Sequence, residues 1–493
     1  MGLMRFAVVP PDRITPQAAE KAYLSGLDRV AWAVSSNLDQ GELVLRRSIS
    51  ESGSLNVPWP VPGSAHGWLT LATGTLAERA EPYHLSLELA RGTVNQLRHQ
   101  LAEWQTIGLA VPEKITAMLS QAIQALSKAA AGETEPARVA EQAEQAIQLA
   151  VDAGTLLGST YADQAIAVRR RGVRRLPTLF GANLGASRAE TLPADALLPA
   201  SNAAIVPLCW REIEASEGTF HWEVSDRQID WCRRQGLKVV AGPLLQLSSA
   251  ALPDWLYLWD GEFEDVFTFL SDFVGAAVKR YRGKVDYWLC AGRLNSAQLL
   301  SLSDEEKLRL AAQSIEVARA LDPGVPTLIS FEQPWAEYLS RRASDFPPVH
   351  FADAMIRSGL DLSGIVLEIN LGYEPGGTLP RTALEWSRHL DFWSSLGVPL
   401  FVTLTVPSDS DPDPNADSGI STVLNRWNPR AQQAWAGRYL PMILAKPYVF
   451  GVLWNQLSDA TAHEFPHGGL FDAQGRPKPI VQTLTAIRQA HLV

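Results

Sequence analysis

Two glutamates at predicted strand ends are the residues best placed to do chemistry in this sequence. Glu332 ends the apolar run 326–332, and Glu368 lies near the end of the apolar run 364–370. Neighbouring strands of a sheet are about 4.8 Å apart, so carboxylates at such ends can face a shared space. Paired carboxylates split their pKa values, which separates an acid role from a base role. The alternative is that both serve structure, with Arg293 as the ion-pair partner.

A polar loop near the end of the sequence holds the next candidates. The stretch SDATAHEFPHGG at 458–469 contains Asp459, His463 and His467. The spelling His-Glu-x-x-His binds zinc when it lies on a helix. Pro466 and the two glycines that follow predict a loop instead, so the two histidines would not share a helical face. We predict no metal site and no cofactor here, and expect the loop to line a cleft.

A second polar loop, SDSDPDPNADSG at 408–419, superficially resembles a calcium loop. Its prolines at 412 and 414 break the spacing that calcium ligands need. We interpret it as a solvated loop that folds over the same cleft.

The elements that carry these residues alternate regularly from residue 177 to 493. Short apolar runs are followed by amphipathic stretches, and eight such units fit in this length. That number and size predict a (β/α)₈ TIM barrel, in which function lies at the carboxyl ends of the strands. The eight predicted strands lie in 178–185, 202–208, 238–245, 285–291, 326–332, 364–370, 399–406 and 449–456.

Two segments of different texture precede the barrel. Residues 1–85 predict a β-rich, sandwich-like domain, with strands in 41–50 and 67–76 and a Pro-rich loop between them. By architecture alone this domain is carbohydrate-binding-like. Residues 86–176 show apolar positions at helical spacing and predict two to four amphipathic helices, a connector that could also mediate self-association through 86–172.

Composition excludes several classes of protein. The formal charge is −10, and the only basic cluster lies at 169–175, so a nucleic-acid partner is not expected. The three cysteines form no Cys-x-x-Cys pair, which argues against a disulfide framework or zinc knuckle. We see no signal peptide and no apolar stretch long enough to span a membrane. We therefore expect a cytoplasmic protein without a membrane partner.

The barrel segment resembles glycoside hydrolase family 10, the endo-β-xylanase family. The resemblance rests on motifs in the order and spacing of that family, covering about two-thirds of the chain. These are Trp210, Glu214, Gly218, Phe220 and Gly236 around the second helix; LPDW at 252–255; Tyr287–Trp288; the strand 397–406; Trp454 and Asp459; and GGLFDAQGRPKPI at 468–480.

When these motifs are matched to the family, neither of the family's catalytic glutamates has a counterpart in this sequence. The general acid position falls at Gly292–Arg293, and the nucleophile position falls at Thr403–Leu404. An arginine does not release its proton near neutral pH, and a leucine cannot attack an anomeric carbon. Substrate-holding residues of the family are also replaced, at Ile205–Val206, Cys209 and near Gly242, and on the sixth strand by Glu368 and Asn370.

The resemblance therefore implies a carbohydrate-active protein with an altered site. It either hydrolyses a β-glycan or oligosaccharide with relocated acids, Glu332 and Glu368, or binds it without hydrolysis. Aromatic faces stack on sugar rings, and polar side chains bind their hydroxyls. The expected substrate-binding residues are Trp454, Asn370, Arg293, Gln246, Asp459, His463 and His467. The alternative is a non-catalytic assembly protein that uses the helical segment for interactions.

Overall fold

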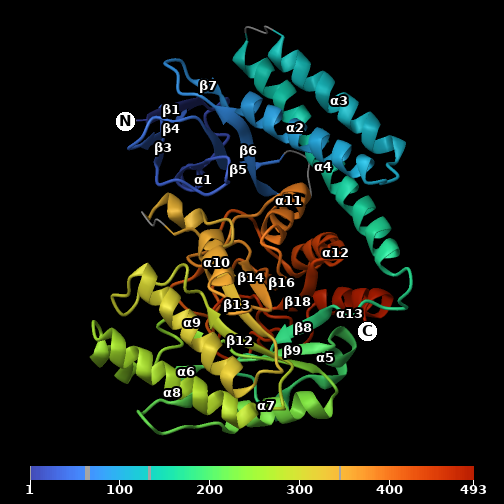
Figure 1. Ribbon diagram of the computed structural model, residues 1–493. Helices are drawn as coiled ribbons and strands as arrows, with labels where there is room; N and C mark the ends of the chain where they lie inside the picture. Colours follow the sequence, from blue (N-terminus) through green and yellow to red (C-terminus); the bar gives the residue numbers. More distant parts are fainter. Residues whose placement is uncertain (1, 62–66, 132–134, 343–345) are drawn as a thin grey trace.

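A closed barrel of eight parallel strands forms the larger part of the computed structural model, which describes residues 2–61, 67–131, 135–342 and 346–493 (Figure 1). Each strand hydrogen-bonds to its two neighbours, and pairing between β10 and β12 is part of the closure. The predicted (β/α)₈ fold is confirmed. Its strands are β8 (Leu179–Asn183), β9 (Ala203–Val206), β10 (Lys238–Ala241), β12 (Tyr287–Gly292), β13 (Thr327–Glu332), β14 (Gly364–Asn370), β16 (Leu400–Thr405) and β18 (Val449–Trp454).

Helices surround the barrel, and short strands extend its loops. The helices of this part are α5 (Ala194–Ala200), α6 (Trp210–Ile213), α7 (Glu223–Arg234), α8 (Phe263–Tyr281), α9 (Asp304–Leu321), α10 (Pro348–Arg357), α11 (Ala383–Ser394), α12 (Pro429–Ala445) and α13 (Ile480–His491). The loop strands are β11 (Leu245–Gln246), β15 (Tyr373–Glu374) and β17 (Ser421–Thr422), and 3₁₀ turns lie at Ala189–Thr191, Asp254–Trp259 and Glu337–Ser340.

Strand alternation divides the barrel side chains into two cores. One set points into the barrel and packs on itself, and the other points outward against the helices. The inward set is Leu179, Ala203, Ile205, Val240, Leu289, Leu328, Val366, Phe401 and Leu453. Because these apolar residues fill the barrel, a ligand site is left only at its mouth.

Two small sheets precede the barrel. One has the strand order β3-β4-β1-β7 and the other β2-β5-β6. Their elements are β1 (Gly2–Ala7), α1 (Pro16–Glu20), β2 (Tyr23–Ser25), β3 (Ser35–Asp39), β4 (Glu42–Arg47), β5 (Gly53–Pro60), β6 (Trp68–Leu76) and β7 (Tyr83–His84).

The first part of the Pro-rich stretch predicted as a loop is in fact strand β5, and residues 62–66 of the stretch lie outside the described residues. Leu55, Val57 and Trp59 alternate along it and are fully buried, which stabilises the strand in spite of two prolines. On its other edge, β2 pairs only with residues 54–56. Pro58 therefore lies where β6 is the sole partner strand, a position that proline tolerates.

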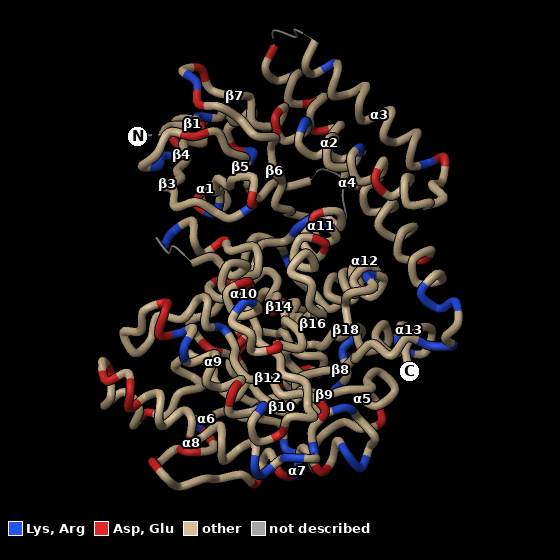
Figure 2. The backbone as a smooth tube through the Cα atoms, in the orientation of Figure 1, with Lys and Arg blue, Asp and Glu red and all other residues tan. Residues whose placement is uncertain are grey.

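Three helices follow, α2 (Leu85–Thr106), α3 (Glu113–Ala130) and α4 (Pro136–Arg169). Their apolar faces share one core with the two sheets. The long helix α4 also runs down beside the barrel and packs on α11 and α12 (Figure 1). The basic cluster lies at its lower end (Figure 2), where Arg169 donates a 3.0 Å hydrogen bond to the carbonyl of Lys446.

None of the helices in the described ranges combines the length and apolarity that a bilayer-spanning helix needs.

Candidate functional site

Glu332 and Glu368 lie directly opposite each other at the carboxyl ends of β13 and β14. Their Cα atoms are register partners in the parallel ladder. Side chains of paired residues point to the same face of a sheet, and here that face is the interior of the barrel mouth. Both residues are buried, at 7% exposure each. The two carboxylates are thus brought into one space by strand register alone.

Arg293 stands between these carboxylates. Its Nε lies 3.0 Å from both oxygens of Glu368 and 3.5 Å from Oε2 of Glu332. Its Nη2 also donates to Glu368, and its Nη1 donates to Oε1 of Glu464 at 2.6 Å. One buried guanidinium therefore contacts three carboxylates, and its charge is compensated from three directions.

The backbone at the end of β12 aims this side chain. Arg293 has a φ of 57°, in the left-handed region that non-glycine residues rarely adopt. The turn is held by Asn295, whose amide donates to the carbonyl of Glu332 at 3.0 Å. Ser296 from the same turn donates to the Glu332 carboxylate. Strained conformations of this kind gather at functional sites.

Amide side chains complete the environment of Glu368. Asn370 and Asn455 each donate to its Oε1 at 3.0 Å, and Asn183 donates to Asn455 at 3.5 Å. Asn183 and Asn455 come from β8 and the end of β18, so the network crosses the barrel mouth. Glu368 is held as an ionised acceptor.

The two glutamates have opposite protonation tendencies. Burial raises the pKa of Glu332 to about 7, with the Arg293 charge opposing and the Glu368 charge reinforcing that shift. Burial also acts to raise the pKa of Glu368, but Arg293 and the hydrogen bonds from Arg293, Asn370 and Asn455 lower it overall. Glu332 can therefore carry a proton near neutral pH while Glu368 stays charged.

A cavity of about 230 Å³ opens beside Glu368 and Arg293. Its lining mixes hydrogen-bonding and apolar side chains, and the apolar floor comes from the barrel interior. Hydrogen-bonding residues of its lining include Asn183, Gln246, Arg293, Ser330, Glu368, Thr403, Asn455, His463 and Glu464. Convergent polar groups over an apolar base are typical of small-ligand sites.

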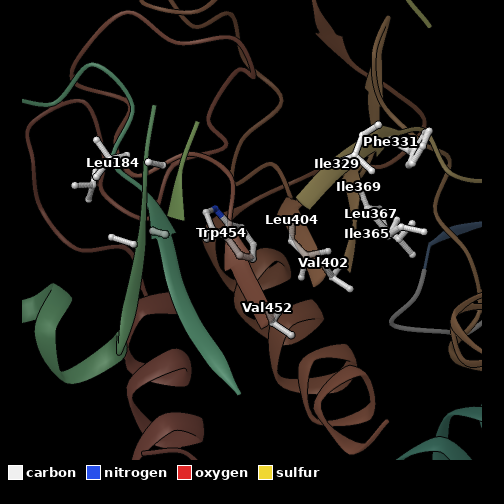
Figure 3. Close-up of a cluster of buried hydrophobic side chains, with 14 of the residues drawn as sticks. Leu184, Ile329, Phe331, Ile365, Leu367, Ile369, Val402, Leu404, Val452 and Trp454 are labelled. Carbon is white, nitrogen blue, oxygen red and sulfur yellow. The ribbon is translucent and has the colours of Figure 1, made fainter. Parts of the chain in front are cut away.

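The seventh strand offers Thr403 to this cavity, and not Leu404. Thr403 is the register partner of Glu368, whereas Leu404 pairs with Trp454 on the opposite face. Figure 3 shows Leu404 and Trp454 side by side in the buried apolar cluster. The indole of Trp454 is 2% exposed, and its Nε1 donates to the carbonyl of Gly468 at 2.7 Å. Trp454 therefore packs in the buried core behind the barrel mouth and does not line the cavity.

The structure places the three polar residues predicted from the last loop in different surroundings. His463 lines the cavity, while Asp459 is buried in a network with Lys478, Gln456 and the backbone of Gly469. The Nε2 of His467 donates to the carbonyl of Asp411 at 2.9 Å.

Within the described residues, Asp413, Asp459 and His463 form one group close enough to hold a metal ion. Asp459 already pairs with the Lys478 ammonium, and Asp413 with His463 at 3.1 Å. The Asp413–His463 contact joins the two polar loops, 408–419 and 458–469.

Several site residues were not singled out from the sequence. Asn183 ends β8 and Asn455 directly follows β18, so both lie near the ends of predicted strands, and that position alone could have indicated them. Ser296 lies in a loop, where strand periodicity gives no signal, and Glu464 lies in the polar loop 458–469, whose sequence alone assigned it no role. Their roles depend on the turn after β12 and on the path of the last loop.

Comparison with known proteins agrees with the barrel fold, and the sequence match covers only part of the barrel. Residues 196–290 match the sequence profile of glycosyl hydrolase family 10. The match ends in β12, just before the turn that carries Arg293. With the closed eight-stranded topology, it gives the chain a family 10-like barrel fold. No curated protein sequence matches the chain significantly.

Solved structures similar to this chain include xylanases and family 10 proteins. Native xylanase 10B from Thermotoga maritima is 13% identical, with 63% of this chain and 95% of that chain covered and a TM-score of 0.48. The family 10 protein from Paenibacillus barcinonensis is 14% identical, with 67% and 98% covered and a TM-score of 0.48. The family 10 xylanase from Thermobacillus composti is 18% identical, with 62% and 95% covered and a TM-score of 0.45.

Proposed function

We propose that this protein binds a β-linked oligosaccharide at the barrel mouth without hydrolysing it by the two-glutamate mechanism of family 10. One observation carries the proposal: Arg293 occupies the space between the two carboxylates and pairs with Glu368 through two of its nitrogens. A carboxylate that also accepts from two amides is a poor nucleophile. The site retains what binding requires, because amides, carboxylates and a guanidinium converge on one cavity.

A second candidate is hydrolysis with relocated acids. It is supported by the opposite pKa shifts of Glu332 and Glu368, the pattern that separates acid from base in glycosidases. In this mechanism Glu332 protonates the leaving oxygen. Glu368 would have to act while still bound to Arg293.

An assembly role for the helical segment has less support. The apolar residues of α2, α3 and α4 are buried in the core they share with the two sheets. Further contacts of α4 go to α11 and α12 of the same chain.

The test is binding calorimetry with xylo- and cello-oligosaccharides beside turnover of aryl β-glycosides. The variants are Glu332→Gln and Glu368→Gln, with Glu305→Gln on an exposed helix start as the matched control. Binding without turnover, weakened by both site variants and not by the control, is the expected result. Turnover abolished by both variants would establish the second candidate instead. The absence of both binding and turnover would refute a carbohydrate function.

A further inference from the structure

A second, larger cavity adjoins the first. Its volume is about 520 Å³, and Arg293 and Glu464 line both cavities. The two spaces therefore meet at the Arg293–Glu464 ion pair. Glu332 lines the second cavity, whereas Glu368 lines the first. A ligand that passes over this ion pair would contact both carboxylate positions.

The N-terminal region builds part of the wall of this second cavity. Lys21, which follows α1, lines it and forms an ion pair with Glu374 of the barrel loop. The Lys21 side chain is 7% exposed, so the contact is enclosed. Arg341 reaches the same carboxylate at 2.9 Å from the other side. Two segments of the barrel loops are thus tied to a residue more than 300 positions earlier.

A buried network behind the wall strengthens this junction. Arg381 donates to the hydroxyl of Tyr23 at 2.8 Å and to Glu337 at 2.6 Å. Glu337 in turn accepts from the amide of Leu379 at 3.0 Å and from the hydroxyl of Thr378 at 2.5 Å. Since Glu337 and Leu379 both line the cavity, the shape of its wall depends on strand β2 of the N-terminal region.

The charges of this lining indicate which ligand it suits. Among the described residues that line it, four are basic and four are acidic. They are Lys21, Arg293, Arg341 and Arg342, and Glu332, Glu337, Glu374 and Glu464. Six of them pair with one another, and Glu337 pairs with Arg381, so little unpaired charge faces the cavity. Serines, two glutamines and two tyrosines add hydroxyl and amide groups. Such a surface suits a neutral, polyhydroxylated chain.

We propose that the second cavity binds the continuing sugar units of the same neutral glycan, with the N-terminal region as an obligatory part of its wall. Lys21 and Tyr23 are positioning residues, which act through Glu374 and through Arg381 and Glu337. This inference rests on the proposed function, since it assumes that the first cavity holds a sugar. In this proposal the N-terminal region is part of one composite site. A separate sugar-binding module would instead bind its ligand independently of the barrel.

The experiment is calorimetry of the full chain with neutral β-1,4-linked xylo- and cello-oligosaccharides of one to six units. In the wild type, affinity should rise with length until the chain spans both cavities. The variants are Lys21→Met, which leaves Glu374 paired with Arg341, and Tyr23→Phe, which removes only the hydroxyl. Arg46→Ala on an exposed part of β4 is the control, and thermal melting confirms that each variant is folded.

Lys21→Met should weaken the longer ligands about tenfold, the effect of losing one charge-assisted contact, and leave the shortest ligand that binds unchanged. Tyr23→Phe should act in the same direction, and Arg46→Ala should have no effect. Affinity independent of length, or an equal loss at all lengths in Lys21→Met, would overturn the composite site while the proposed function stands. If no oligosaccharide binds the wild type, both fail.

Discussion

Arg293 is the central charge of the barrel mouth. A buried cation is costly unless anions compensate it, and here three carboxylates do so. The same contacts engage Glu332 and Glu368, the two carboxylates that could act as an acid and a base. The left-handed backbone at Arg293 is the local conformation that makes this arrangement possible.

Removing the guanidinium should therefore lower the stability of the folded protein. Arg293→Met leaves Glu368 and Glu332 buried without their cation, and we expect a loss of about 3–5 kcal/mol in the free energy of unfolding. Urea denaturation followed by tryptophan fluorescence measures it. Arg282→Met, at an exposed position after α8, should change stability by less than about 0.5 kcal/mol. Equal, small effects of both substitutions would mean that the carboxylates are not held by Arg293.

The pKa of Glu332 predicts a pH dependence of stability. Its folded value of about 7 lies above the ordinary value of 4.5, so the folded state favours the protonated form. The stability from this group is fully present below pH 4.5 and is lost as pH rises through about 7. Relative to Glu332→Gln, the wild type should lose roughly 3 kcal/mol between about pH 4.5 and 8. Parallel stability curves for the two proteins across this range would contradict the assignment.

At the scale of elements, packing between backbone surfaces decides where the helical segment lies. Helix α2 approaches strand β6 so closely that a Cβ on Gly92 would lie 1.9 Å from the carbonyl oxygen of Ala72. A connector helix needs no such contact. The helical segment is therefore a layer of the N-terminal core.

Gly92→Ala tests this contact. The added methyl must push α2 away from β6, and such overpacking costs about 1–3 kcal/mol. The matched control is Gly74→Ala on β6 itself, where a Cβ would meet no atom within 4 Å. Thermal unfolding should show a lower midpoint for Gly92→Ala alone. An unchanged midpoint would mean that the helix and sheet separate at little cost.

At the scale of the whole molecule, the N-terminal region and the barrel are joined by polar contacts at the site. The amide of Thr70 donates to Pro380 at 2.6 Å, and that of Val34 donates to Ser340 at 3.0 Å. Arg381, 2% exposed, lies at the centre of this interface between Tyr23 and Glu337.

Arg381→Met should loosen this junction selectively. It leaves the Glu337 carboxylate buried without its cation, so hydrogen exchange should accelerate in residues 23–25 and 337–340. Stability should fall by about 3–5 kcal/mol. Arg430→Met, at the exposed start of α12, is the control and should leave both segments protected. Uniform acceleration over the whole chain would indicate general destabilisation and not a specific junction.

The barrel could be predicted from the sequence because its information is local. Eight apolar runs separated by amphipathic stretches define the strands and their order, and right-handed βα connections leave one way to close them. The placement of Glu332 and Glu368 at strand ends follows from the same pattern. Strand β5 was missed because its prolines signal a loop, and only its burial between β2 and β6 outweighs them.

The sequence by itself therefore determined the barrel and the two strand-end carboxylates. Tertiary structure alone decided which face each strand residue presents, so that Thr403 and not Leu404 reaches the cavity. It also decided that Glu464 meets Arg293 and that Lys21 meets Glu374. These contacts join residues far apart in the chain through loops, where no periodicity constrains the path and only the folded surroundings select one conformation.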